Sequence, residues 1–194
     1  RAGKGILGEE RWIHLELKLL ADVGLIGFPN AGKSTLLSVI SQARPKIADY
    51  PFTTKSPVLG VVRVGEKSFT VADLPGLIEG ASQGVGLGFK FLKHIEKTRI
   101  FLHLIDLSDP THQDPFESYA LIRKELETYK ADFLDRPEII VLTKIDMPEM
   151  KARAEEVVKK FKKMKKKVLM ISARSHRNLD QLLGETATLL FGGG

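Results

Sequence analysis

The chain has 194 residues, a length typical of a single domain with a full hydrophobic core. It contains no cysteine, which excludes disulfides and thiolate metal sites, and its five histidines do not have the spacing of zinc ligands. The net charge is +6, but the segment 159–167 (KKFKKMKKK) holds seven lysines, and without them the chain would carry a net charge of −1. The positive charge is therefore a local feature.

The lysine-rich segment also carries an apolar pattern. Val157, Val158, Phe161 and Met164 recur at helical spacing, which predicts an amphipathic helix with these four side chains facing inward and the lysines in solvent. We favour this interpretation over its alternative, a contact with RNA. No apolar run approaches the roughly 18 residues of a membrane span, and no basic-then-apolar leader is present. We expect a cytoplasmic monomer that does not span a membrane.

Apolar, β-rich runs recur along the chain, with helix-length segments between most of them. This alternation predicts an α/β fold with a mostly parallel six-stranded sheet, one antiparallel strand, and helices on both faces. Only a short turn around Gly65 separates the second and third runs, so these two should form an antiparallel hairpin. His103 lies inside a continuous apolar run, which favours a core residue over a ligand. The six runs cover residues 22–27, 57–64, 68–73, 100–106, 138–143 and 167–172.

The segment GFPNAGKST, residues 27–35, follows the first run and precedes a helical pattern. It matches G-x-x-x-x-G-K-[ST], whose backbone N–H groups wrap phosphates at a helix N-terminus. We expect Lys33 to reach the β- and γ-phosphates and the Ser34 hydroxyl to ligate magnesium. The strand-loop-helix context is the one this motif requires, so the sequence predicts a P-loop nucleotide site.

Asp73 ends the third run and is followed by Leu-Pro-Gly. An acid after a strand can also cap a helix, but beside a P-loop it lies where ligands of open α/β sheets bind. We therefore predict that Asp73 holds magnesium through water, and that Gly76 lets the backbone approach the γ-phosphate. Leu77, the next residue, has no hydrogen-bonding group, so it cannot orient an attacking water as glutamine does in many GTPases.

Two further segments predict the choice of base. TKID, residues 143–146, ends a strand, and the Asp146 carboxylate can accept hydrogen bonds from guanine N1–H and its exocyclic amine. Adenine lacks both donors, so guanine is favoured. We expect the stem of Lys144 to lie beneath the base, and backbone N–H groups of SAR, residues 172–174, to reach guanine O6.

The segments after the P-loop and after Asp73 are expected to respond to the γ-phosphate. Residues 43–57 contain prolines and paired threonines, which argue against regular structure, and we favour Thr54 over Thr53 as a ligand of magnesium. Residues 77–99 hold Gly80, Gly84, Gly86 and Gly88 before a helical pattern, which predicts a second switch.

These motifs together closely resemble the Obg family of translation-factor GTPases over about residues 9–190. The resemblance implies a cytoplasmic GTP hydrolase that binds the large ribosomal subunit during its assembly, with magnesium on Ser34 and Thr54. It also implies that residues 1–20 are a linker or the remnant of a glycine-rich N-terminal domain, and that residues 21–194 are the GTPase domain. Asn30 resembles a P-loop asparagine with which some GTPases bind potassium.

The sequence departs from the family at Thr143, where asparagine is usual, so a contact with the base or the P-loop is expected to be lost or shortened. Arg174 is also unusual, and we assign it no role. Three other functions stay open: a nucleotide-gated binding module with negligible turnover, an ATPase subgroup, and a nucleotide kinase. The last two are disfavoured by Asp146 and by the lack of an arginine-rich lid.

The predicted site is a large set. Catalytic roles are assigned to Lys33, Thr54 and Asn30, and metal binding to Ser34, Thr54 and Asp73. Nucleotide contacts are assigned to Gly27, Phe28, Pro29, Asn30, Ala31, Gly32, Lys33, Ser34, Thr35, Phe52, Thr53, Thr54, Asp73, Leu74, Pro75, Gly76, Thr143, Lys144, Asp146, Ser172, Ala173 and Arg174.

Overall fold

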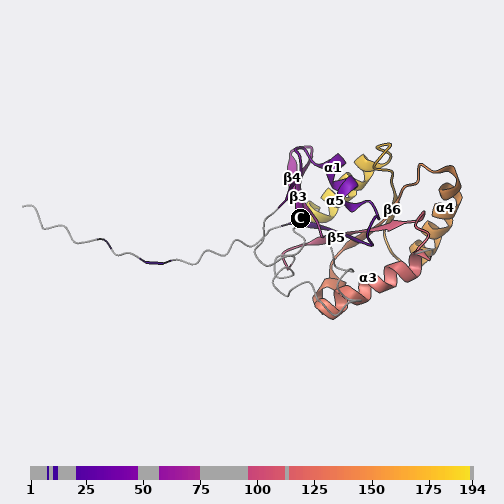
Figure 1. Cartoon of the computed structure of the whole chain (residues 1–194), viewed down its shortest axis with the longest axis horizontal. Coiled ribbons are helices and arrows are strands. Elements are labelled where there is room, and N and C mark those ends of the chain that lie inside the picture. Colours follow the sequence, from indigo (N-terminus) through magenta and orange to yellow (C-terminus); the bar gives the residue numbers. More distant parts are fainter. Residues whose placement is uncertain are drawn as a thin grey trace, which may run out of the picture.

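The computed structural model describes residues 8, 11–12, 21–47, 57–74, 96–111 and 114–192. This part of the chain is a single sheet with helices on both faces (Figure 1). Most of the predicted linker at residues 1–20 lies outside the described residues. The elements are β1 (Val23–Gly27), α1 (Lys33–Ile40), β2 (Lys46–Ile47), β3 (Val58–Val64), β4 (Lys67–Asp73), β5 (Ile100–Asp106), α3 (Pro115–Tyr129), the 3-10 helix η2 (Ala131–Asp135), β6 (Glu138–Thr143), α4 (Pro148–Lys163), β7 (Val168–Met170) and α5 (Leu179–Phe191).

The sheet has the strand order β2-β3-β4-β1-β5-β6-β7. Strands β4, β1, β5, β6 and β7 pair in parallel, and β3 is antiparallel to both of its neighbours. The predicted mostly parallel sheet with one antiparallel strand is confirmed. Because parallel strands end at the same edge, the residues that follow β1, β4, β5 and β6 are brought together there.

Two details of the sheet differ from the prediction. A seventh strand, β2, lies within the segment predicted to lack regular structure, because pairing with β3 recruits two residues that have no strand pattern of their own. The last strand is shorter than predicted, ending at Met170. The β3–β4 hairpin is confirmed, and Gly65 in its turn has φ +59°, a conformation that glycine adopts without steric cost.

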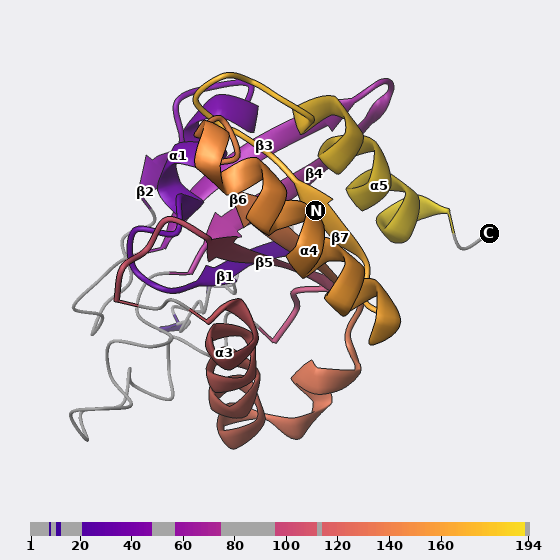
Figure 2. The ribbon, with the colours of Figure 1, turned by 90° about the vertical axis from the view of Figure 1, so that its right-hand side faces the viewer.

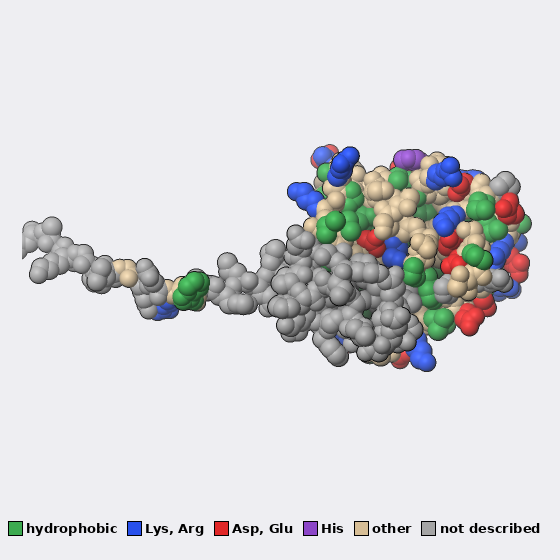
Figure 3. Space-filling model, viewed as in Figure 1, with side chains coloured by type: hydrophobic (Ala, Val, Ile, Leu, Met, Phe, Trp, Pro, Cys, Tyr) green, Lys and Arg blue, Asp and Glu red, His purple; other side chains and the backbone are tan. Residues whose placement is uncertain are grey.

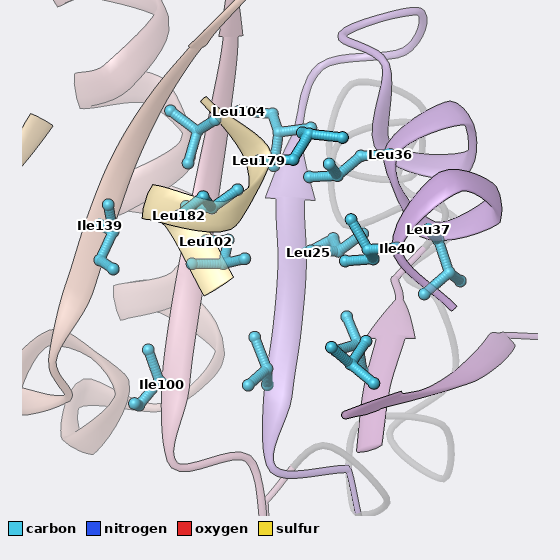
Figure 4. Packing of buried hydrophobic residues seen from close by; sticks show 14 of the residues in the cluster. Leu25, Leu36, Leu37, Ile40, Ile100, Leu102, Leu104, Ile139, Leu179 and Leu182 are labelled. Atoms are coloured by element: carbon cyan, nitrogen blue, oxygen red, sulfur yellow. The ribbon is translucent and has the colours of Figure 1, made fainter. Parts of the chain in front are cut away.

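The two faces of the sheet are covered by different helices. Ile100, Leu102 and Leu104 of β5 belong to a cluster with side chains of α1 and α5, as Figure 4 shows. The alternate residues Phe101 and Ile105 pack with α3, η2 and α4 instead. Figure 2 shows α1 and α5 on one side of the strands and α3 on the other. The near-continuous burial of β5 follows from this double cover.

Helix α4 is amphipathic, as the apolar pattern predicts. Val157 and Phe161 are buried against the sheet, and Val158 is partly buried. Met164 is 52% exposed, so its predicted inward orientation is wrong, because the helix ends at Lys163 and the helical spacing does not continue. Within the ranges that the structure describes, no helix is both long enough and apolar enough to cross a bilayer.

Candidate nucleotide-binding site

The P-loop connects β1 to α1 through two glycines with unusual backbone angles. Gly27 has φ +150°, and a Cβ atom there would lie 2.5 Å from the Leu104 carbonyl oxygen, so no larger residue fits. Gly32 has φ +94° and caps α1, whose first turn contains no acidic side chain. The free backbone N–H groups and the dipole of this helix end therefore favour an anion.

Lys33 folds over the loop that precedes it. Its Nζ donates hydrogen bonds of 2.9 Å to the carbonyl oxygens of Gly27 and Phe28. The ammonium is thus held above the loop where the phosphates are predicted to bind. Asn30, near the tip, is exposed and has φ +63°. Pro29 and Thr35 are also exposed, on either side of the buried Ala31.

Ser34 and Asp73 meet at the junction of α1 and β4. The Ser34 hydroxyl donates a hydrogen bond to Asp73 Oδ2 at 2.5 Å. Asp73 lies at the end of β4, where it pairs with Leu25 of the parallel strand β1. The Asp73 side chain is buried, and its Oδ1 has no hydrogen-bond partner in the described part of the chain. A buried, unpartnered carboxylate oxygen beside a hydroxyl fits a hard cation or its water.

Several predicted residues of this half of the site cannot be placed. Leu74 is described, and its side chain packs in the core with Ile26, Ala72 and Phe101 rather than lying at the surface. The residues Phe52, Thr53, Thr54, Pro75, Gly76, Leu77, Gly80, Gly84, Gly86 and Gly88 lie outside the described residues.

Asp146 lies between β6 and α4, two residues before the helix begins. It is exposed, and its Oδ1 accepts a 2.7 Å hydrogen bond from the Ser172 hydroxyl. This bond, with smaller contributions from a backbone hydrogen bond and from the charges of Arg174 and Lys144, lowers the pKa of the Asp146 carboxyl. The backbone of Ser172 is held in turn by a two-way bridge to Arg177. Asp146 is therefore an ionised acceptor next to the SAR segment, with Ala173 partly buried and Arg174 exposed.

Thr143 connects the base segment to the P-loop. Its buried hydroxyl lies 3.0 Å from the Ala31 carbonyl oxygen and 3.4 Å from that of Ile105. The expected loss was of a contact with the base or with the P-loop; the contact with the P-loop is present, and the contact with the base stays a prediction.

Sequence reasoning missed Asp106, which fixes Lys144. The Asp106 carboxylate is buried at the end of β5; its Oδ2 accepts from Lys144 Nζ at 2.5 Å, and its Oδ1 accepts from the Ser108 backbone N–H and hydroxyl at 2.9 and 2.7 Å. Lys144 itself has φ +59°. The missed signal is that Asp106, like Asp73, ends an apolar run at the carboxyl edge of the sheet.

A small pocket lies behind the P-loop, between Ala31, the end of β5 and the first turns of α3. His103 lines it, fully buried and stacked on the Tyr119 ring at 5.1 Å between centroids. Neither ring nitrogen has a hydrogen-bond partner in the described part of the chain, and burial lowers the pKa of His103 to about 4. The prediction that His103 is a core residue is confirmed.

Residues 22–144 match a protein family described as 50S ribosome-binding GTPase. The chain is 55% identical over 184 residues to GTPase Obg from Syntrophotalea carbinolica, covering 94% of this chain and 52% of that protein. It is 56% identical over 190 residues to GTPase Obg from Streptococcus mutans, covering 94% and 44%. The resemblance drawn from the motifs is confirmed, and the chain spans about half the length of these relatives.

Solved structures agree on the fold. The G domain of the T. maritima iron transporter FeoB superposes with a TM-score of 0.64 at 20% identity, covering 88% of this chain and 98% of that one. A variant of Aquifex aeolicus Era bound to GDP and AlF4⁻ gives 0.62 at 24% identity, covering 89% and 57%. Both likenesses concern the fold alone, and they confirm the predicted P-loop NTPase architecture.

Proposed function

Because the chain belongs to the family of 50S ribosome-binding GTPases, we propose that it binds GTP and hydrolyses it to GDP and phosphate. The observation that carries this proposal is the Ser34–Asp73 pair, 2.5 Å apart, at the sheet edge where Asp146 also lies. The proposed phosphate, metal and base contacts would therefore all lie at the same edge of the sheet. Asp146, held as an anion by Ser172, favours guanine over adenine.

We propose that Ser34, Asp73 and Thr54 hold Mg²⁺. Hydroxyl and carboxylate oxygens are ligands that this ion prefers, and the buried Asp73 Oδ1 would gain a partner. When bound, the ion neutralises charge on the phosphates. The chain's own contribution is to orient the triphosphate with Lys33 and the backbone of the P-loop, and to exclude adenine with Asp146. We also propose that Asn30 contributes to a potassium site.

Calorimetric titration of the chain with GDP, GTP and ATP in magnesium tests the proposal. GDP and GTP should bind at least tenfold more tightly than ATP, because adenine lacks the two donors that the Asp146 carboxylate accepts from guanine. Ser34→Ala should weaken binding only when magnesium is present, whereas Ser38→Ala, which removes an exposed hydroxyl four residues further along α1, should bind as the wild type does. Equal affinity for ATP and GTP would contradict the guanine assignment.

We further propose that the nucleotide state controls binding to the large ribosomal subunit during its assembly, and so that the protein acts in the cytoplasm. The family description and the two Obg relatives support this role. We place the domain boundary near residue 20, before β1. Co-sedimentation with isolated 50S subunits should be stronger with a non-hydrolysable GTP analogue than with GDP, and no difference between the two nucleotides would reject a switch.

A second candidate is a nucleotide-gated binding module whose own turnover is negligible. It is favoured by Leu77, which cannot orient a water molecule. Phosphate release measured with and without 50S subunits separates the two. Turnover that stays below about one per hour in both conditions supports the module, and turnover that ribosomal particles stimulate supports the enzyme.

A further inference from the structure

Four of the seven lysines in the segment 159–167 have no ion pair with any carboxylate in the described part of the chain. They are Lys159, Lys162, Lys163 and Lys165, all exposed, and we call them the lysine patch. The other three lysines form ion pairs: Lys160 with Glu156, Lys166 with Glu138 and Lys167 with Glu185. Figure 3 shows basic and acidic side chains interspersed over the face of the molecule seen in Figure 1.

Lys165 occupies a backbone position that does not suit a lysine. It has φ +57° just beyond the end of α4, where its N–H bonds to the Lys162 carbonyl and the next N–H bonds to the Phe161 carbonyl. Glycine is the usual residue in this left-handed position after a helix, because it has no Cβ to clash. A lysine at this position therefore does not stabilise the fold, and its exposed side chain can contact a partner.

The position of the patch separates it from the nucleotide. Helix α4 begins two residues after Asp146 and runs 16 residues away from the base segment, which is about 24 Å. The last turn already contains Lys160, Lys162 and Lys163, which satisfy the negative end of the helix dipole. Lys165 adds a charge beyond what that dipole requires.

The composition of the patch selects the class of partner. A membrane surface would need a free apolar face, but Val157 and Phe161 of α4 are buried in the core. The exposed apolar side chain beside the lysines is Met164, a flexible thioether that can pack against a sugar or base. Repeated lysines around one such side chain suit a phosphate backbone.

We propose that the lysine patch binds the phosphate backbone of RNA, which is the alternative that the sequence pattern alone did not favour. The choice of RNA over DNA rests on the proposed ribosomal function, whereas the assignment of a phosphate backbone to the patch does not depend on that function. Nucleotide binding and RNA binding are then separate properties of opposite ends of α4, so either can be lost without the other.

The main test replaces the patch and compares it with an equal loss of charge elsewhere. The quadruple variant K159Q/K162Q/K163Q/K165Q is compared with K46Q/K97Q/K124Q/K151Q, four exposed lysines that likewise have no ion pair with a described carboxylate. Binding to purified 23S ribosomal RNA is measured by fluorescence anisotropy at several KCl concentrations. The patch variant should lower the slope of log K against log[KCl] by about 3, and the control by less than 1. Equal losses in the two variants would overturn the proposal.

A single substitution separates binding from stability. Lys165→Gly should raise the melting temperature by about 2–4 °C, because glycine relieves the left-handed strain, while lowering RNA affinity about fivefold. A more stable protein with unchanged RNA affinity would leave Lys165 without the proposed role.

Two further probes decide the partner and the dependence on function. Phosphatidylserine vesicles or polyglutamate that compete more strongly than 23S RNA for the patch would reject RNA as the partner. GDP affinity should be equal in the wild type, the patch variant and Lys165→Gly. If the patch binds RNA but 50S subunits do not respond to nucleotide, the ribosomal function fails and the patch assignment stands.

Discussion

The Thr143 hydroxyl lies 3.0 Å from the carbonyl oxygen of Ala31 and so joins the segment that recognises the base to the loop that wraps the phosphates. Both residues are buried. The bond fixes the distance between the two halves of the site without help from the nucleotide. A ligand that contacts both halves therefore finds them already in register, which lowers the entropic cost of binding.

Thr143→Val should speed the release of GDP about five- to tenfold, because the isosteric methyl leaves the buried Ala31 carbonyl without this partner, at a cost of about 1 kcal/mol. Thr143→Ser keeps the hydroxyl and should release GDP at a rate close to that of the wild type. Stopped-flow measurement of fluorescent GDP release gives both rates. If valine and threonine release GDP equally fast, the hydrogen bond does not couple the two halves.

Asp146→Asn should weaken GDP binding by at least tenfold and improve binding of xanthosine diphosphate. Xanthine carries a carbonyl where guanine carries its amine, and this carbonyl prefers the donor that an asparagine amide supplies. Competition titrations with the two diphosphates measure the change. The matched variant Ser172→Ala, which removes the hydrogen bond to Asp146, should weaken GDP binding without changing which base is preferred. Unchanged GDP affinity in Asp146→Asn would remove Asp146 from the site.

The parts of the molecule predicted from sequence are those with a local signal. Continuous apolar runs such as 100–106 and 138–143 specify strands covered on both faces, and the P-loop spacing locates Lys33 and Ser34. Strand β2 was missed because its two residues are defined by their pairing with β3. Asp106 was missed because its partner Lys144 is 38 residues away, and only the β5–β6 register brings them together. The inward position assigned to Met164 failed because nothing in the pattern marks where α4 ends.

The contribution of His103 to stability should fall by up to about 3 kcal/mol as the pH is lowered from 6.5 to 4. Burial lowers the pKa of His103 from 6.5 to about 4 in the folded protein, so between these values the unfolded chain binds the proton more readily. The stabilising contribution is therefore present above pH 6.5 and is lost as the pH falls through this range. Urea denaturation at several pH values measures it.

His103→Phe provides the control for this pH dependence, since phenylalanine can keep the stacking on Tyr119 but cannot titrate. Glu125, whose pKa burial raises to about 7, contributes with the opposite sign, because the folded state then holds its proton more tightly. The quantity to compare is therefore the difference between wild type and variant, in which the contribution of Glu125 cancels. Parallel stability curves from pH 7 to 4 would show that His103 does not titrate in this way.

Leu77→Ala should change the rate of GTP hydrolysis less than twofold, because the isobutyl group has neither a donor nor an acceptor with which to orient water. Backbone groups of the glycine-rich segment and Thr54 are then the candidates for holding the water. Thr54→Ala is the informative partner variant and should slow hydrolysis at least tenfold. Single-turnover phosphate release gives these rates. A loss of more than tenfold in Leu77→Ala would assign Leu77 an active part.

Potassium should stimulate hydrolysis, and Asn30 should be required for the effect. Asn30 is exposed on the P-loop three residues before Lys33, and its φ of +63° places it in a left-handed turn that asparagine tolerates well. A monovalent cation bound there would offset the charge that develops between the β- and γ-phosphates, as an arginine does in other GTPases. Replacing sodium by potassium at constant ionic strength should therefore raise turnover severalfold in the wild type. Asn30→Ala should abolish this rise while leaving the rate in sodium nearly unchanged, and Asn30→Asp, which keeps an oxygen ligand, should preserve part of it. Equal wild-type rates in the two salts would exclude the cation, and the charge would then have to be offset by Lys33 and magnesium alone.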